Sequence, residues 1–200
     1  QKDPVWDQVC FCDTCLAGFA RDRAVEPPAD CTTTAGKAAW ILENHPADWY
    51  DWRSDRVAHV VRRMRDLVKE VRGPDAVLGI FAVPLRHEDY DNAIIRIFGQ
   101  DWRKLAPYVD VFSPMVYHLY CGRPVEWIRD VTAEMAAESG KTLWPIVQSC
   151  SEPVEMSAQE FRLALEWGAK EPSRGVMIFG TRHTLEEGKW ETMAEVFRKM

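Results

Sequence analysis

The sequence lacks any long hydrophobic run, and it lacks an excess of basic residues. A membrane-spanning helix needs about 20 consecutive apolar residues, and no stretch of this chain approaches that length. The chain has 25 Lys and Arg against 31 Asp and Glu, which gives a formal net charge of -6. No basic cluster stands out, so we expect neither a membrane nor a nucleic acid as the main partner. The composition is typical of an ordinary soluble, acidic protein.

Other absences narrow the choice of cofactor. No G-x-G-x-x-G loop and no Walker-type loop follows any predicted strand, which argues against nucleotide binding. We therefore expect no organic cofactor. The chain begins at Gln1 rather than Met, which fits a mature form or a piece of a longer protein. The missing signal peptide consequently indicates no compartment.

Four short apolar runs are present instead, and each is followed by polar, glycine or proline residues. Such runs are typical of strands buried on both faces. Their centres lie roughly 30 residues apart, the size of a βαβ unit. The runs occupy residues 77–84 (VLGIFAVP), 109–117 (VDVFSPMVY), 142–149 (TLWPIVQS) and 175–181 (GVMIFGT).

Amphipathic helical patterns separate these runs. The first is at residues 53–72, where apolar residues recur at steps of three and four and Arg side chains form a solvated opposite face. Weaker helices are predicted near 90–98 and 102–105, and another runs from Pro124 to Gly140. Ser157 and Glu160 form a capping box that predicts the start of the next helix. A last helix begins near residue 189.

Alternating strands and helices predict an α/β fold with a parallel sheet covered by helices. The 200 residues fit a single domain. We divide it into a cysteine-containing loop region at 1–50 and four helix–strand units at 51–200. An open doubly wound sheet and a closed barrel both fit this alternation of strands and helices. Both also place polar residues at the carboxyl ends of the strands, so the polar residues after each run do not distinguish them.

The motifs resemble one family group. Ser113–Tyr117, SPMVY, looks like the sixth-strand motif of uncharacterised glycosyl hydrolase barrels, and the GVMIF strand is also similar to that group. The segment CFCDTCLAGF, at residues 10–19, resembles the loop after the fourth strand in glycoside-hydrolase-like barrels. The resemblance implies the second half of a (β/α)8 TIM barrel, with four parallel strands alternating with helices. The first four strands would then come from upstream sequence or from another chain.

Four cysteines fall in the first region. Cys10, Cys12 and Cys15 have C-x-C-x-x-C spacing, which can converge on one tetrahedral zinc. Zinc-bearing beta-galactosidases use similar spacing, and there the fourth cysteine lies upstream. Cys31 is the nearby candidate for a fourth ligand in this chain. Such a zinc would be structural, while free thiols or a disulfide such as Cys10–Cys31 are the alternatives.

A glycosidase needs two carboxyl groups across the scissile bond. The loop after the predicted strand at 77–84 offers Glu88 and Asp89, which we take as the candidate catalytic residues. The loop after 142–149 offers Glu152 and Glu155, further from the strand end. A complete pair of carboxylates is not visible, so part of the active site is expected upstream of this chain.

Other residues at the strand ends suit the binding of a sugar. Tyr117 and Tyr120 can stack on a pyranose ring, although packing inside a barrel is an equally good role for Tyr117. The candidates for bonding sugar hydroxyls are His118, Gln148, Arg182 and His183.

Three functions remain open at this point. The first is a glycoside hydrolase that acts on an oligo- or polysaccharide by carboxylate acid/base catalysis. The second is a metal-dependent hydrolase of the amidohydrolase type, with His87, His118 and His183 near a metal. The third is a barrel that binds carbohydrate without catalysis.

Overall fold

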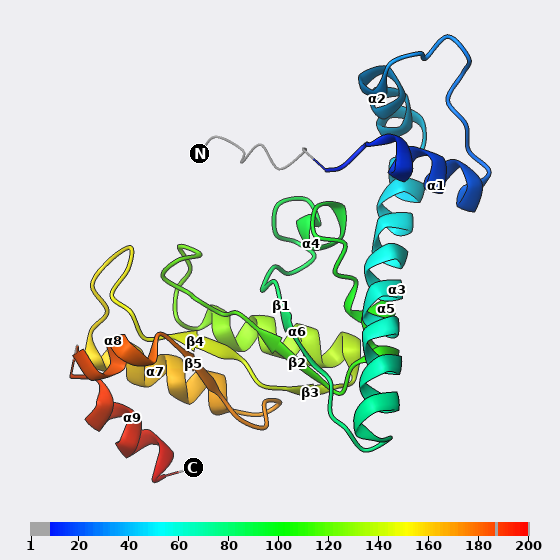
Figure 1. Ribbon diagram of the computed structural model, residues 1–200. Coiled ribbons are helices and arrows are strands. Elements are labelled where there is room, and N and C mark those ends of the chain that lie inside the picture. Colours follow the sequence, from blue (N-terminus) through cyan, green and yellow to red (C-terminus); the bar gives the residue numbers. More distant parts are fainter. Residues whose placement is uncertain (1–8, 187, 200) are drawn as a thin grey trace.

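The structure, a computed structural model, describes residues 9–186 and 188–199 (Figure 1). The strands are β1 (Gly79–Ala82), β2 (Val111–Pro114), β3 (Thr142–Leu143), β4 (Ile146–Gln148) and β5 (Met177–Phe179). The helices are α1 (Asp13–Arg23), α2 (Thr34–Asn44), α3 (Pro46–Arg72), α4 (Ala93–Arg96), α5 (Trp102–Leu105), α6 (Trp127–Ser139), α7 (Ala158–Ala169), α8 (Thr181–Glu186) and α9 (Trp190–Phe197), with a 3-10 turn, η1, at Ala106–Tyr108.

Every strand pairing in the described part of the chain is parallel. β1 pairs with β2, β2 with β3, and β4 with β5. β3 and β4 are two parts of the strand predicted at 142–149, separated at Trp144 and Pro145, where Pro145 has no N–H to donate to a ladder. A bridge between Met115 and Ile146 joins β2 to β4. The strands therefore follow one another in chain order, and the predicted α/β class with parallel strands is confirmed.

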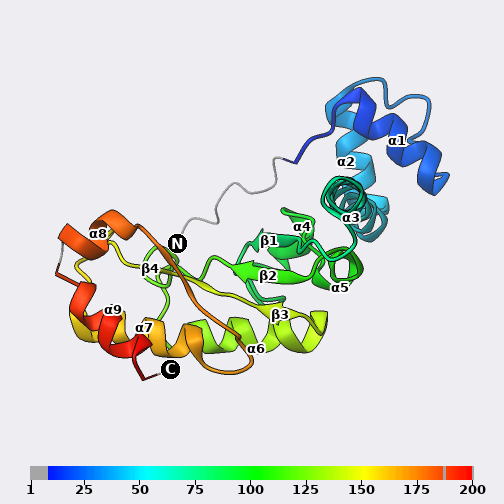
Figure 2. The ribbon, with the colours of Figure 1, turned by 60° about the horizontal axis from the view of Figure 1, so that its bottom comes forward.

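The helices lie along one face of this sheet, as Figure 2 shows for α6 and α7. Ile80, Ala82 and Phe112 point to that face and pack with residues of α5 and α6. Val147 and Ile178 do the same against α6 and α7. Complete burial of an apolar side chain of this size contributes about 1.5–3 kcal/mol, so these two core clusters anchor the helices to the sheet.

Sequential strand order with helices along one face distinguishes the two architectures left open by the sequence. A doubly wound sheet reverses its strand order and carries helices on both faces, whereas a (β/α)8 barrel keeps chain order with all helices outside. The helices in contact along the outer face of the sheet are, in order, α3, α5, α6, α7 and α9. The arrangement is that of a barrel wall with four strand positions.

Residues 9–45 form a helical cap and not the irregular loop that we expected at 1–50. α1 and α2 pack on the N-terminal half of α3, at the end of the molecule drawn uppermost in Figure 1. Phe19, Trp49 and Trp52 are buried between these helices. The Thr33 hydroxyl accepts a hydrogen bond from the Gly36 N–H at 3.0 Å and so caps α2. Residues 1–8 of the predicted loop region lie outside the described residues.

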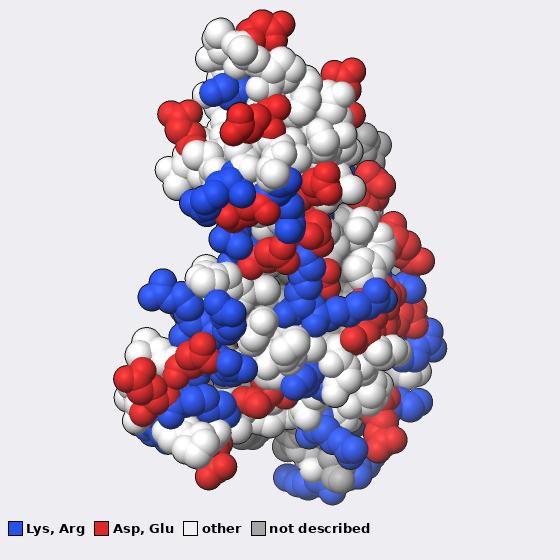
Figure 3. All heavy atoms as spheres, turned by 90° about the vertical axis from the view of Figure 1, so that its right-hand side faces the viewer, with Lys and Arg blue, Asp and Glu red and all other residues white. Residues whose placement is uncertain are grey.

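Charged residues fix the cap side of α3. The Arg23 guanidinium donates to the carboxylates of Asp51 and Asp55, at 2.6 Å and 2.5 Å. The Lys104 ammonium, from α5, contacts the same two carboxylates. Figure 3 shows basic and acidic side chains intermixed over this side of the molecule. In the described part of the chain, no helix has the length and apolar character that crossing a membrane requires.

Candidate functional site

Three aromatic side chains meet at the carboxyl end of the sheet. The rings of Tyr117 and Phe179 are stacked, with centroids 4.9 Å apart and planes at 28°. The ring of Tyr120 meets Tyr117 edge-on, with centroids 6.4 Å apart. Tyr120 and Phe179 are 47% and 48% exposed, so their faces are available to a ligand. We call Tyr117, Tyr120 and Phe179 the aromatic platform.

Gln148 holds the loops beneath this platform. It pairs with Phe179 in the β4–β5 register and is fully buried. Its Oε1 accepts from the N–H groups of Leu119 and Tyr120, at 3.1 Å and 3.2 Å. Its Nε2 donates to the carbonyls of Cys150 and Glu152, at 3.1 Å and 3.0 Å. We expected Gln148 to bond sugar hydroxyls, but its amide is occupied by the protein backbone.

A carboxylate stands beside the platform. The Tyr120 hydroxyl donates to Glu152 Oε2 at 3.1 Å, and the Cys150 thiol lies 3.7 Å from the same hydroxyl. The hydrogen bonds with Cys150 and Glu152 raise the pKa of Tyr120 to about 12. Tyr120 therefore stays protonated and donates a hydrogen bond to Glu152. Burial raises the pKa of the Tyr117 hydroxyl.

The two candidate catalytic carboxylates occupy different surroundings. The Glu88 side chain is 69% exposed and accepts from Arg86 Nη1 at 2.6 Å. Asp89 is only 7% exposed. Its two oxygens accept from Arg123 Nη2 at 2.5 Å and from the Arg86 N–H at 2.8 Å. Asp89 thus ties the loop after β1 to the loop after β2, a structural role that the sequence did not indicate.

His118 turns away from the platform. It is fully buried, and its Nε2 lies 3.3 Å from Glu160 Oε1 on α7. Burial lowers its pKa and keeps the ring neutral. We expected His118 to contact substrate, whereas the structure packs it between the loop after β2 and α7. Arg182 and His183 lie on α8, directly after the last strand, with Arg182 exposed and His183 half-buried.

Three of the four predicted metal ligands come together in the cap. The thiols of Cys10, Cys12 and Cys15 lie within 4.8 Å of one another, and the Cys10 and Cys15 sulfurs are 3.7 Å apart. A hydrogen bond from the Cys15 backbone, followed by contacts with the other two thiols, lowers the pKa of Cys12. Burial, helped by the neighbouring thiols, raises that of Cys15 to about 12. The structure leaves Cys31 outside this group. Three sulfur donors at this spacing fit a tetrahedral zinc with one further ligand.

A second group with metal-ligand chemistry is His87, Glu134 and Glu138. Its members already have partners. His87 Nε2 lies 2.9 Å from Glu138, and Arg86 Nε donates to Glu134 at 2.5 Å. The group therefore forms an ion-pair cluster between the loop after β1 and α6. His87, His118 and His183 do not gather into a ligand group within the described residues, so the geometry does not favour the amidohydrolase alternative.

Sequence reasoning missed Phe179 and Arg123. Phe179 lies near the carboxyl end of the strand predicted at 175–181, and an aromatic residue at that position was the available signal. Arg123 had no comparable signal, because its partner Asp89 lies 34 residues away along the chain.

Comparisons with solved structures give distant neighbours of this chain, one of which is described here. No family model matches this chain, and no curated protein matches it. A solved structure described as the endo-beta-1,4-mannanase from Thermotoga petrophila is similar with a TM-score of 0.47 and 16% sequence identity. The match covers 82% of this chain and 45% of the mannanase chain, so this chain spans about half the length of that protein.

Proposed function

We propose that this chain carries part of the active-site cleft of a glycoside hydrolase that acts on an oligo- or polysaccharide. The supporting observation is the aromatic platform at the carboxyl end of the strands, with the Glu152 carboxylate beside it. In barrels of this type the ligand binds at that end of the strands. Half-exposed aromatic faces suit the C–H surface of a sugar ring, and a carboxylate suits its hydroxyl groups.

Catalysis requires a proton donor and a nucleophile or base, both carboxyl groups. Glu88 is the proposed catalytic carboxyl group of this chain, because its side chain is exposed. The carboxylate of Asp89 is engaged by Arg123, and we expect it to hold the loop that carries Glu88. The second catalytic carboxyl group is proposed to lie outside this chain.

The binding part of the proposal is tested with the 200-residue chain and a panel of soluble oligosaccharides in isothermal titration calorimetry. We expect Phe179→Ala to weaken binding at least ~tenfold, equivalent to about 1.4 kcal/mol. Phe81→Ala is the matched control, because Phe81 is also an exposed strand residue but lies outside the platform. Equal loss in both variants, or no binding by the parent chain, would contradict the proposal.

The catalytic part needs the complete barrel and aryl glycosides as substrates. We expect Glu88→Gln to lower kcat about 10²–10⁴-fold with little change in KM, the usual effect of losing a general acid or base. Glu166→Gln is the control, because Glu166 is exposed on α7 and lies outside the loops that follow the strands. Saccharide binding without hydrolysis by the complete barrel would indicate a non-catalytic carbohydrate-binding protein instead.

A further inference from the structure

A further aromatic side chain lies at the carboxyl end of the sheet. Tyr90, in the loop that follows β1, is 44% exposed, so part of its ring is open to a ligand. The Arg123 guanidinium lies over this ring, with 5.9 Å between its central carbon and the ring centroid. Tyr90 lies outside the aromatic platform. Exposure alone assigns it no role, since single exposed aromatic residues are common on protein surfaces.

The backbone at Tyr90 is a second observation. Tyr90, Asp91 and Asn92 have φ values of 50°, 54° and 57°, so three consecutive residues lie in the left-handed region. Asn and Asp enter this region several times more often than other residues, whereas a bulky side chain such as that of Tyr rarely does. Such a conformation persists only where its surroundings hold it, and residues of this kind gather at ligand sites.

Nearby side chains hold this left-handed turn in place. Arg96 donates from Nε to the Asp91 carbonyl at 2.9 Å and from Nη2 to the Tyr90 carbonyl at 3.3 Å. His87 Nδ1 lies 2.8 Å from Asn92 Oδ1. These contacts fix the Tyr90 backbone before a ligand binds, which reduces the entropy that binding costs.

The turn after β2 connects Tyr90 with the platform. A hydrogen bond of 2.8 Å from the Arg123 N–H to the His118 carbonyl closes this turn. Tyr120, within the turn, belongs to the platform. Arg123, at the end of the turn, donates to the Asp89 carboxylate and covers the Tyr90 ring. The loops after β1 and β2 are therefore joined at Arg123, and Tyr90 continues the platform toward β1.

The strand order gives the extent of this surface. Three strand-to-strand steps separate β1 from β5, the strand that carries Phe179. Each step is about 4.8 Å, so the two strands are about 14 Å apart. One sugar ring is shorter than this distance. A ligand that contacts both ends of the surface must therefore contain several rings.

We propose that Tyr90, with Arg123 behind its ring, forms a second sugar-binding contact, and that an oligosaccharide of several rings lies across the strand ends from Phe179 to Tyr90. Glu88 precedes Tyr90 by two residues, so this contact holds the saccharide beside the proposed catalytic carboxyl group. The apolar face of the Tyr90 ring suits the C–H surface of a sugar, and the guanidinium keeps the ring oriented. The inference rests on the proposed function, because it extends the same surface.

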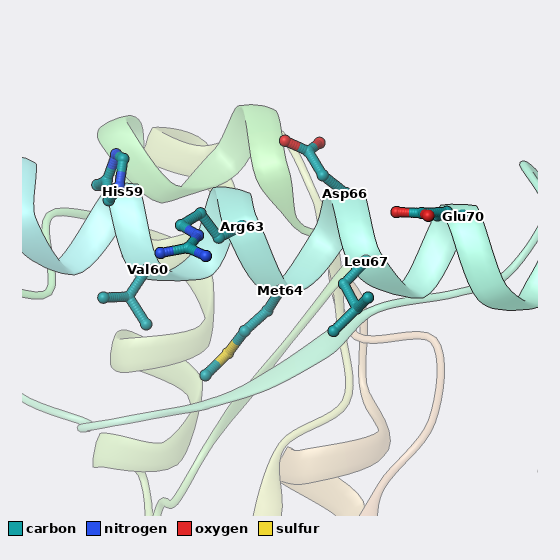
Figure 4. A pocket seen from close by; sticks show the side chains of 7 residues that line it. All are labelled: His59, Val60, Arg63, Met64, Asp66, Leu67 and Glu70. Carbon is teal, nitrogen blue, oxygen red and sulfur yellow. The ribbon is translucent and has the colours of Figure 1, made fainter.

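A groove on α3 is a competing place for a saccharide. It has a volume of about 530 Å³, and the residues that line it all belong to α3. Figure 4 shows Val60, Met64 and Leu67 projecting to the same side of the helix. Among the described residues that line this groove there is no Phe, Tyr or Trp, so it offers no such ring for stacking. We expect it to contribute nothing to saccharide binding.

The test measures how affinity depends on the length of the saccharide. Isothermal titration calorimetry of the 200-residue chain uses β-1,4-linked gluco-, manno- and xylo-oligosaccharides, each from two to six units long. Tyr90→Gly removes the ring and keeps the turn, because Gly accepts a positive φ without strain. We expect this variant to bind the longest saccharide at least ~tenfold more weakly and a disaccharide within about twofold of the parent. Tyr90→Phe, which keeps the ring, should bind all lengths like the parent.

Tyr108→Ala is the matched control. Arg65 lies over the Tyr108 ring at 5.3 Å in the same way, but η1 precedes β2 and so lies at the amino end of the strands. Met64→Ala tests the groove, and neither variant is expected to change an affinity. A similar loss in either control, or a loss in Tyr90→Gly that is independent of length, would overturn the inference and leave the proposed function standing. No binding of any saccharide by the parent would overturn both.

Discussion

At the scale of single residues, Gln148 has the largest structural effect near the platform. One buried amide satisfies two backbone N–H groups from the loop after β2 and two carbonyls from the loop after β4. Buried backbone groups that lose their partners are costly, since they leave water without compensation. Gln148 therefore fixes the position of Tyr120 and Glu152 relative to one another.

We predict that Gln148→Leu lowers the free energy of unfolding by about 2–4 kcal/mol, because it leaves these backbone groups without partners in a space of similar volume. Urea denaturation measures the change. Gln159→Leu, at an exposed position of α7, is the control and should stay within about 0.5 kcal/mol of the parent. A loss below about 1 kcal/mol at position 148 would show that water or rearranged loops replace the amide.

The site residues were predictable from the sequence only in part. Tyr117 and Tyr120 follow a clear strand, so their place at its carboxyl end could be predicted. The orientation of His118 could not, because it depends on the packing of the loop against α7. Likewise, the Asp89–Arg123 pair joins two loops, and charge alone does not reveal such a pairing in a sequence.

At the scale of elements, a cluster of charges joins the loop after β1 to α6. Burial alone would lower the pKa of His87, but its hydrogen bonds with Asn92 and Glu138 outweigh burial and raise the pKa. The other charged groups of the cluster are Glu134, Arg86 and Arg103. An imidazolium at His87 thus bridges the two elements.

This shift predicts a pH dependence of stability. The folded pKa of His87 lies above the unfolded value of 6.5, so its stabilisation is complete below that pH and is lost as the pH rises through the folded pKa. We expect the difference in unfolding free energy between the parent and His87→Gln to be larger near pH ~5.5 than near ~8.5. Urea denaturation at both pH values measures it, with His59→Gln on exposed α3 as the control. A difference that grows with pH would contradict the assignment.

The group of Cys10, Cys12 and Cys15 lies at the start of α1. We propose that Cys10, Cys12 and Cys15 bind one structural zinc, with Cys31 or another group as the fourth ligand. Metal analysis of the purified protein is expected to find about one zinc per chain, and Cys12→Ser should abolish it. Cys121→Ser, at a distant loop, is the control. Loss of zinc in Cys31→Ser would show that the loop rearranges to bring Cys31 in, and a zinc-free parent would refute the site.

The elements themselves were largely predictable where a local pattern was strong. The apolar periodicity at residues 53–72 predicted most of α3, and the capping box predicted the start of α7. The Ser157 hydroxyl accepts a hydrogen bond from the Glu160 N–H, as the capping box implies. α1 was missed, because its sequence, DTCLAGFARDR, has no sustained apolar face. It is stabilised by Phe19 and Leu16 packing against α3, a tertiary contact that periodicity does not show.

At the scale of the whole molecule, the helices cover one face of the sheet, while the large apolar side chains of Phe81 and Trp144 are exposed to solvent. These exposed side chains predict that the native chain alone binds a hydrophobic dye. The double substitution Phe81→Ser with Trp144→Ser should reduce the dye signal and lower the unfolding free energy only modestly, because the two residues are 64% and 42% exposed. Dye fluorescence and urea denaturation of the same samples test this. A large loss of stability would mean that these side chains are buried in solution.

The length of α3 determines how α1 and α2 are attached to the rest of the molecule. Its 27 residues span about 40 Å, whereas the four residues of β1 span about 13 Å. The helix is therefore much longer than the strand beside it. Val57 and Val61 of α3 pack against the core of the sheet, and its N-terminal half carries α1 and α2. Because α1 and α2 are attached through α3, around Trp49 and Trp52, we expect that another module could replace residues 9–45 while the strands keep their pairing.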